Sequence, residues 1–341
     1  MRCDGVAPTK VVSAATGGGV TLRHTNHVES EDMRILVVGA GATGGYFGGR
    51  LLQAGQDVTF LVRERRAALL GQDGLHIRSA LGDADLAAPP TVTAATLRGA
   101  YDLVLLGCKA WDLPQAIEDI APAMGGHSAV LPILNGMRQL DLLDARFGAA
   151  RVLGGQCVIA ATLDADGTVR HLNRSHSLSF GERDGSDSER VRRIARVMAG
   201  ANFEPHASAT IVQDMWDKWV FLASLAGITC LMRAPVGDIV AAPGGREATL
   251  ALLDDCRHVA AACGHEPHPA VLQRAGGVLT ESGSTLSASM MRDLEHGHRV
   301  EADHVIGDLL ARGEAHGVET PLLRLAHAHL KAYEARRAHA R

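Results

Sequence analysis

The sequence has few aromatic residues and no concentrated block of charge of one sign. Phe, Trp and Tyr make up 4% of its 341 residues, and the formal net charge is −4 with His neutral. Nucleic-acid-binding surfaces usually cluster Lys and Arg and often add aromatic side chains that stack on bases. The longest apolar runs are short or are broken by Gly and charge, whereas a membrane helix needs about 20 apolar residues. We therefore expect neither a nucleic-acid partner nor a membrane segment.

Paired cysteine spacings are also absent. None of the six cysteines forms a CxxC pair, and most lie among aliphatic residues, which is typical of free buried thiols in a reducing compartment. No apolar segment of the secretory kind follows the N-terminal charge. The 17 histidines include no HExxH spacing, which would place two imidazoles and a carboxylate on one helical face. The sequence predicts a cytoplasmic protein without a metal site.

The length of the chain and a change of pattern at Met33 indicate how it is organised. A chain of 341 residues with 46% hydrophobic and 21% charged residues is expected to form two globular domains. Residues 1–32 contain Gly17-Gly18-Gly19 and show no helical or strand period, which predicts a flexible tail or an upstream start codon with the natural start at Met33. We expect domains over residues 33–207 and 208–336.

Hydrophobic periodicity predicts the fold class of each domain. Strands are predicted over residues 34–38, 57–62, 75–78, 103–107, 129–134, 152–162, 168–171 and 177–181. Helices are predicted over residues 43–53, 211–225, 246–263, 269–279, 287–296, 300–316 and 322–336. Strands that alternate with helices specify a parallel sheet. The prediction is an α/β protein: an N-terminal Rossmann-type, doubly wound parallel sheet followed by an all-α C-terminal domain.

A glycine-rich turn directly after the first predicted strand indicates a dinucleotide site. The turn reads Gly39-Ala40-Gly41-Ala42-Thr43-Gly44 and opens the first predicted helix. Gly39 permits the tight turn, Gly41 lets the backbone approach a pyrophosphate, and Gly44 lets helix and strand pack closely. The alternative is a strand–helix turn that holds no ligand.

The residue after the second predicted strand indicates which dinucleotide is bound. A carboxylate there would accept hydrogen bonds from the ribose hydroxyls of NAD, but this sequence has Arg63. A guanidinium binds a 2′-phosphate bidentately, whereas a carboxylate repels it. NADP(H) is therefore the predicted cofactor, with a solvated Arg63 and a ribose contact from Glu64 as the alternative.

Several short segments, in order along the chain, resemble the ketopantoate reductase family, the NADPH-using 2-dehydropantoate 2-reductases. They are Gly39–Gly44, Arg63, Gly107-Cys108-Lys109-Ala110-Trp111, Leu134-Asn135-Gly136-Met137, Trp216-Asp217-Lys218, Ser289-Met290-Met291-Arg292-Asp293 and Glu301-Ala302-Asp303. The resemblance runs from Met33 to about Lys331. It implies a Rossmann-type domain and a helical domain with the active site between them.

The resemblance also implies roles for individual residues. Lys109 and Asn135 match positions at the cofactor and substrate, and Ser289 matches a substrate-binding position. Lys218 matches the proton donor, which stabilises the alkoxide that forms when a ketone is reduced. Glu301 matches the acidic residue near the nicotinamide and the substrate, with Asp293 as a supporting carboxylate. Without the resemblance, Lys218 would be a surface lysine, Ser289 an ordinary helix residue and Glu301 a solvated side chain.

The sequence departs from the family where asparagines usually contact the substrate. Leu222 and Ala226 stand four and eight residues after Lys218, and Val236 occupies a further asparagine position. Aliphatic groups remove hydrogen bonds to the polar end of the substrate. Reduction of a branched 2-oxo acid, ketopantoate or a relative in the pantothenate pathway, is the first hypothesis. The alternatives are another NAD(P)-dependent dehydrogenase, including one that forms a secondary amine, and a non-catalytic NADP(H) sensor.

The loss of these amides raises the question of what pairs with the substrate carboxylate. Arg233, on the segment that leaves the Lys218 helix, is the candidate, because guanidinium pairs bidentately with carboxylate. Equally, Arg233 could be a surface residue stabilised by the helix macrodipole. The oligomeric state stays open, with a homodimer as one alternative.

Overall fold

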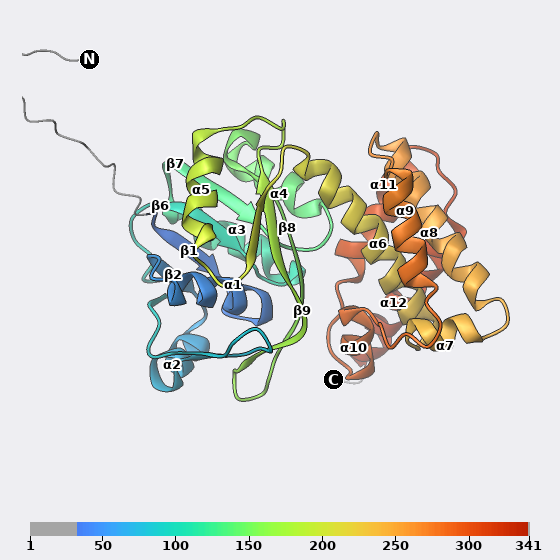
Figure 1. Ribbon diagram of the computed structural model, residues 1–341, viewed down its shortest axis with the longest axis horizontal. Coiled ribbons are helices and arrows are strands. Elements are labelled where there is room, and N and C mark those ends of the chain that lie inside the picture. Colours follow the sequence, from blue (N-terminus) through green and yellow to red (C-terminus); the bar gives the residue numbers. More distant parts are fainter. Residues whose placement is uncertain (1–32, 340–341) are drawn as a thin grey trace, which may run out of the picture. The chain divides into compact units, whose positions relative to one another are not determined.

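Residues 33–339 are the part of the chain that the computed structural model describes. The prediction for residues 1–32 lies outside the described residues. From Met33 onward, an α/β region is followed by an all-helical region (Figure 1). This order confirms the predicted fold class.

The first sheet is parallel throughout and has the strand order β5-β2-β1-β6-β7. Its strands are β1 (Ile35–Val38), β2 (Val58–Leu61), β5 (Thr91–Val92), β6 (Tyr101–Leu106) and β7 (Met124–Pro132). The chain moves outward from β1 first to one side and then to the other, which makes the sheet doubly wound. Ligands of such sheets bind at the carboxyl ends of the strands, where the direction of winding reverses. Here that point lies between β1 and β6.

A helix follows each of the strands β1, β2, β6 and β7, as is typical of a parallel sheet. These helices are α1 (Ala42–Gln53), α2 (Glu64–Asp73), α3 (Leu113–Ile120), which follows the short helix η1 (Ala110–Asp112), and α4 (Arg138–Phe147). All four residues of β1 are buried, as expected for a strand covered on both faces.

A second, mixed sheet was not predicted as a separate sheet. Its order is β10-β9-β3-β4, and β8 pairs with β9. The strands are β3 (Leu75–Arg78), β4 (Ala84–Leu86), β8 (Gly154–Leu163), β9 (Val169–Gly181) and β10 (Glu204–Ala207), and α5 (Glu189–Ala199) precedes β10. The prediction of two strands over 168–171 and 177–181 is wrong, because one 13-residue strand covers both. Backbone pairing with β8 lies on both sides of the polar middle of β9: between Ile159 and Ala161 the register shifts, and the partner on β9 changes from His176 to His171.

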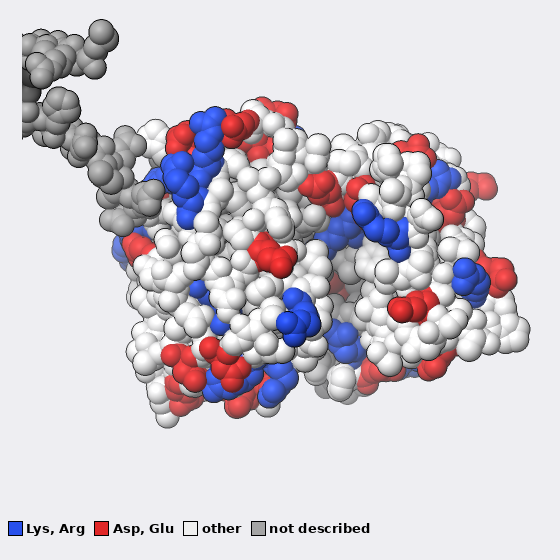
Figure 2. Space-filling model, in the orientation of Figure 1, with Lys and Arg blue, Asp and Glu red and all other residues white. Residues whose placement is uncertain are grey.

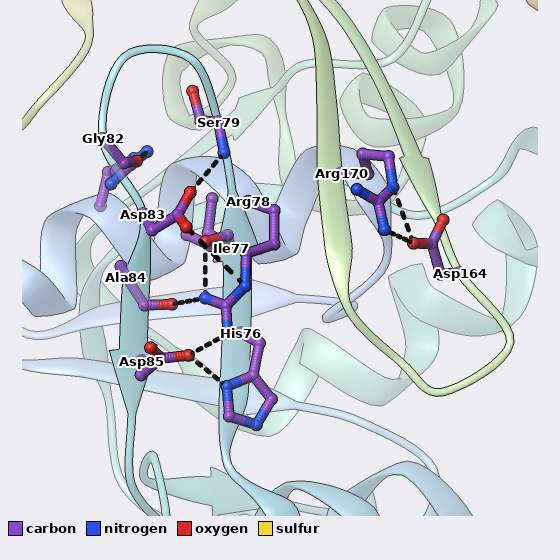
Figure 3. Close-up of polar contacts among 11 residues, drawn as sticks. His76, Ile77, Arg78, Ser79, Gly82, Asp83, Ala84, Asp85, Asp164 and Arg170 are labelled. Atoms are coloured by element: carbon purple, nitrogen blue, oxygen red, sulfur yellow. Dashed lines mark hydrogen bonds and ion pairs between the residues drawn. The ribbon is translucent and has the colours of Figure 1, made fainter.

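Surface ion pairs join β3 to β4 and the two strands of the β8–β9 hairpin (Figure 3). Arg78 lies 2.8 Å from Asp85 across the β3–β4 pair, and His76 Nδ1 lies 2.5 Å from the same carboxylate. Hydrogen bonds from Arg78 and His76 hold the pKa of Asp85 below its usual range. In the hairpin, Arg170 lies 2.6 Å from Asp164. On the face drawn in Figure 2, basic and acidic side chains are interspersed in small groups.

The second region is helical from Ile211 onward. Its helices are α6 (Ile211–Met232), α7 (Val236–Ala241), α8 (Gly245–Ala262), α9 (Pro269–Leu279), α10 (Ser289–Glu295), the π-helix η4 (Asp303–Gly307), α11 (Asp308–Ala315) and α12 (Pro321–His339). The helix predicted over 300–316 therefore begins later and with a π-helical turn. Such turns are frequent at functional sites.

Helix α6 is the centre of this region and is seven residues longer than predicted. By length and composition alone it could cross a membrane, but 67% of its apolar window is buried within the protein. It packs against α8, α10 and α12. A helix that is apolar on all sides is expected in the core of a protein of this size. Near its N-terminus, Lys218 faces the carboxyl ends of the first sheet.

Candidate active site

The glycine-rich turn lies between β1 and α1, as predicted, and has room for a phosphate. Gly39 has φ +89°, and a Cβ on Gly44 would lie 2.1 Å from Gly39 O, so side chains are excluded at both positions. At Gly41, by contrast, a Cβ would meet no atom within 4 Å. Gly41 caps α1 without a side-chain hydrogen bond, which leaves the first N–H groups of the helix free for an anion. The geometry fits the pyrophosphate of a dinucleotide.

Two arginines lie at the start of α2, and one of them contacts this turn. Arg63 caps the N-terminus of α2, its side chain is 80% exposed, and it donates a hydrogen bond to Asp112 at 2.5 Å. Arg66 donates to Ala40 O and to Gly167 O, each at 3.1 Å, and so fastens the glycine-rich turn to the β8–β9 hairpin. The supporting role of Arg66 was not predicted, because no local motif marks a contact with Gly167.

Lys109 follows β6 and meets two carboxylates from the helical region. Its Nζ lies 3.5 Å from Asp293 and 3.7 Å from Glu301, and it stacks over the Trp111 ring. Glu301 Oε1 also accepts a hydrogen bond from the Ala110 N–H at 2.9 Å. The structure thus brings Lys109 together with two carboxylates that are more than 180 positions away in the sequence.

Lys218 and Asn135 meet at the carboxyl end of β7. Lys218 Nζ donates to Asn135 Oδ1 at 3.1 Å and to Cys157 O at 2.6 Å. An ammonium has three N–H groups, so one donor is left for a substrate oxygen. Burial lowers the pKa of Lys218, which makes its ammonium a stronger acid than that of an exposed lysine.

A small pocket adjoins this pair. It is lined by Leu134, Asn135, Gly136, Gly155, Gln156, Met215, Lys218, Trp219 and Leu222. Leu222, at the first missing asparagine position, therefore faces the pocket with an aliphatic group. Ala226 and Val236 are 2% and 1% exposed and belong to the hydrophobic core.

A buried network that the sequence analysis missed supports the Asn135 loop. Gln139 Nε2 donates to Gly136 O at 2.6 Å, and Gln139 Oε1 is 3.0 Å from His304 Nε2. Trp219 Nε1 donates to Val305 O at 2.8 Å in the same π-helix, η4. Burial lowers the pKa of His304. The only sequence feature that points to this network is the closeness of Gln139 to Asn135 and of His304 to Glu301.

Two of the predicted substrate residues lie at the ends of helices. Ser289 is the exposed first residue of α10, one turn from Asp293 on the same helical face. Arg233 is not brought to the site: it caps the C-terminus of α6 with φ +56° and is exposed. Fifteen residues of helix separate it from Lys218, roughly 22 Å along the axis. The uninterrupted continuation of α6 to Met232 is the reason.

The part of the chain that the structure describes contains no group of three or more His, Cys, Asp or Glu side chains that could hold a metal ion.

Comparisons with known proteins agree with this geometry. The family models for the ketopantoate reductase PanE/ApbA and for its C-terminal domain match residues 35–185 and 210–334. An uncharacterized oxidoreductase of Bacillus subtilis, YkpB, is 38% identical over 89% of this chain and 99% of its own length. A 2-dehydropantoate 2-reductase of Mesorhizobium japonicum is 28% identical over 85% of this chain and 94% of its own.

Solved structures extend the comparison. The 2-dehydropantoate 2-reductase of Geobacter metallireducens is 26% identical and has a TM-score of 0.80, over 88% of this chain and 99% of its own. A D-mandelate dehydrogenase with NADH and anilino(oxo)acetate has a TM-score of 0.80 at 21% identity, over 90% of this chain and 100% of its own, which shows a common fold. The protein is an oxidoreductase that acts on CH–OH groups, and proteins of this kind use NAD(P)H. With family models that cover most of its length, the chain belongs to the ketopantoate reductase family.

Proposed function

We propose that the protein reduces a branched 2-oxo acid to the 2-hydroxy acid with NADPH. The observation that carries this proposal is the buried Lys218 ammonium, held by Asn135 Oδ1 and Cys157 O with one N–H left over. The dinucleotide, when bound, supplies the hydride. Lys218 would hydrogen-bond the ketone oxygen, stabilise the negative charge that develops on it, and transfer a proton to it.

The choice of NADPH over NADH rests on Arg63. Its exposed guanidinium, at the N-terminus of α2, is available to a 2′-phosphate, although Asp112 competes for it. The glycine-rich turn would take the pyrophosphate on its free N–H groups. Lys109, between Asp293 and Glu301, would lie near the nicotinamide end, where Glu301 orients the loop after β6 through the Ala110 N–H.

The identity of the acid depends on the wall of the pocket formed by α6. Leu222 lines this wall, and an aliphatic wall supports the binding of a branched apolar side chain. A second candidate is another 2-hydroxy acid dehydrogenase activity, since the same fold serves D-mandelate dehydrogenase. A sensor without activity is disfavoured, because Lys218 and Glu301 are both present. A step in pantothenate biosynthesis in the cytoplasm is part of the proposal.

The test is oxidation of NADPH with a panel of 2-oxo acids, including ketopantoate, by the wild-type protein and by Lys218→Met. We expect turnover with at least one branched acid, and a loss of about 10²–10⁴-fold in Lys218→Met with cofactor affinity retained. Arg324→Met, at an exposed arginine of α12, is the control and should retain full activity. Near-full turnover of Lys218→Met would remove Lys218 from its role.

A further inference from the structure

The pocket beside Lys218 contains a polar atom that the protein does not pair. Gln156, on β8, lines this pocket together with Asn135 and Lys218. Within residues 33–339, its side-chain oxygen Oε1 is buried and has no hydrogen-bond partner. Asn135 Oδ1, in contrast, accepts from Lys218 Nζ. A buried acceptor without a donor destabilises a folded protein, so an atom of this kind in a pocket calls for a ligand that donates to it.

Close backbone packing holds β8 against this pocket. A Cβ on Gly155 would lie 2.5 Å from Pro132 O, so only glycine lets β8 run this close to the end of β7. The next residue along β8 after Gln156 is Cys157, whose carbonyl oxygen accepts from Lys218 Nζ at 2.6 Å. One short segment of β8 therefore both anchors the proton donor and presents an amide beside it.

The opposite wall offers no amide. Leu222, one turn after Lys218 on α6, lines the pocket with an aliphatic side chain, and Ala226 is buried in the core. We propose that Gln156 Oε1 accepts a hydrogen bond from a hydroxyl group on the side chain of the 2-oxo acid, and that this contact selects hydroxylated substrates. This inference rests on the proposed function and names the substrate class of the same site.

The chemistry of the atom limits what it can bind. The carboxylate and ketone oxygens of a 2-oxo acid are acceptors and cannot pair with Oε1. An ammonium group on the substrate would be repelled by the nearby Lys218 charge, so a neutral donor such as a hydroxyl is favoured. The hydroxyl formed by reduction is common to all products, so it cannot distinguish one acid from another.

The experiment compares two acids that differ by one hydroxyl group. Ketopantoate carries a hydroxymethyl group where trimethylpyruvate carries a methyl group. For the wild-type protein we expect kcat/KM to be at least about tenfold higher for ketopantoate, because the apolar acid leaves Oε1 unpaired. In Gln156→Met the ratio should fall to near one, chiefly through loss of activity with ketopantoate. Gln115→Met, the same change on the exposed face of α3, should keep the wild-type ratio.

The other possible results of this experiment separate the role of Gln156 from the proposed function. Equal use of the two acids by the wild-type protein, or an unchanged ratio in Gln156→Met, overturns the role of Gln156 and leaves the proposed function standing. No turnover of either acid overturns the proposed function, and this inference with it. Thermal unfolding of unliganded Gln156→Met adds an independent readout: we expect an unchanged or higher Tm, because the variant loses an unpaired buried oxygen. A lower Tm would assign Gln156 a structural role.

Discussion

Burial and two oxygen acceptors act on Lys218 in opposite directions. Removal from water lowers its pKa, whereas Asn135 Oδ1 and Cys157 O stabilise the charged form. Burial therefore makes the Lys218 proton easier to lose than that of an exposed lysine, and the two acceptors limit this effect. A surface lysine, such as the sequence alone would suggest, has neither property.

The pH dependence of reduction should therefore report on Lys218. The proton donor must be protonated, so activity should fall as the pH rises through its pKa, and this fall should come below the ordinary lysine value of about 10.4. Asn135→Ala removes one acceptor of the ammonium and should move the fall to still lower pH. The measurement is kcat/KM against pH with the best 2-oxo acid found. A fall that is unchanged in Asn135→Ala would contradict this role of the amide.

The Arg63–Asp112 pair should tune the choice of cofactor. Asp112 lies 2.5 Å from the guanidinium that is proposed to bind the 2′-phosphate, and its charge would also repel that phosphate. Asp112→Asn should raise the kcat/KM ratio of NADPH to NADH by about two- to fivefold, since exposed charge pairs contribute up to about 1 kcal/mol. Arg63→Asp should lower the ratio strongly. Asp119→Asn, on α3, is the control, and an unchanged ratio in Asp112→Asn would refute the competition.

The bounds of helices and strands were predicted best where hydrophobic periodicity and glycine occur together. The strand β1, the glycine-rich turn and helix α1 were expected almost as they stand, and β3 and α9 have the predicted bounds. Such segments can be predicted from their own residues, because hydrophobic periodicity and helix-end signals are local features of the sequence. The division of the strands into two sheets was missed, because pairing partners such as β3 and β9 are distant in the sequence.

The candidate site shows the same limit. The resemblance supplied Lys109, Asn135, Lys218 and Glu301, and the structure brings them together in two contacting pairs. Arg233 was proposed as the partner of the substrate carboxylate on a segment leaving the Lys218 helix, but this helix continues to Met232 and Arg233 is its exposed C-terminal cap. Gln139 and His304 escaped notice because a buried hydrogen bond between two helical elements leaves no pattern in either segment.

The buried hydrogen bonds of Gln139 to Gly136 and His304 should link the loop that carries Asn135 to η4. Gln139→Leu would leave Gly136 O and His304 Nε2 without their hydrogen-bond partner. We expect the free energy of unfolding to fall by about 2 kcal/mol or more. We also expect kcat to fall, because the loop that holds Lys218 through Asn135 is no longer supported. Chemical denaturation and steady-state kinetics measure the two effects, with Gln115→Leu as the control. Normal kcat in a destabilised variant would limit Gln139 to a structural role.

For the folded unit as a whole, the helical region and the first sheet meet at functional groups. Glu301 accepts a hydrogen bond from the Ala110 N–H. Lys109 pairs with Asp293. Lys218 donates a hydrogen bond to Asn135. Both regions therefore build the site, and α6 supplies its proton donor from an otherwise buried, apolar helix. A ligand that binds at this junction stabilises only the folded state.

Binding of NADPH should accordingly raise the Tm of the whole described unit. A ligand at 100 times its Kd stabilises the folded state by about 2.7 kcal/mol. Gly41→Ala offers a sharp test, because a Cβ at Gly41 meets no protein atom within 4 Å and so should leave the unliganded Tm unchanged. The added methyl group would instead occupy space that the pyrophosphate needs, so the shift caused by NADPH should be largely lost. Gly71→Ala on α2 is the matched control: its Cβ also meets nothing within 4 Å, and the shift should persist. A full NADPH shift in Gly41→Ala would place the dinucleotide elsewhere.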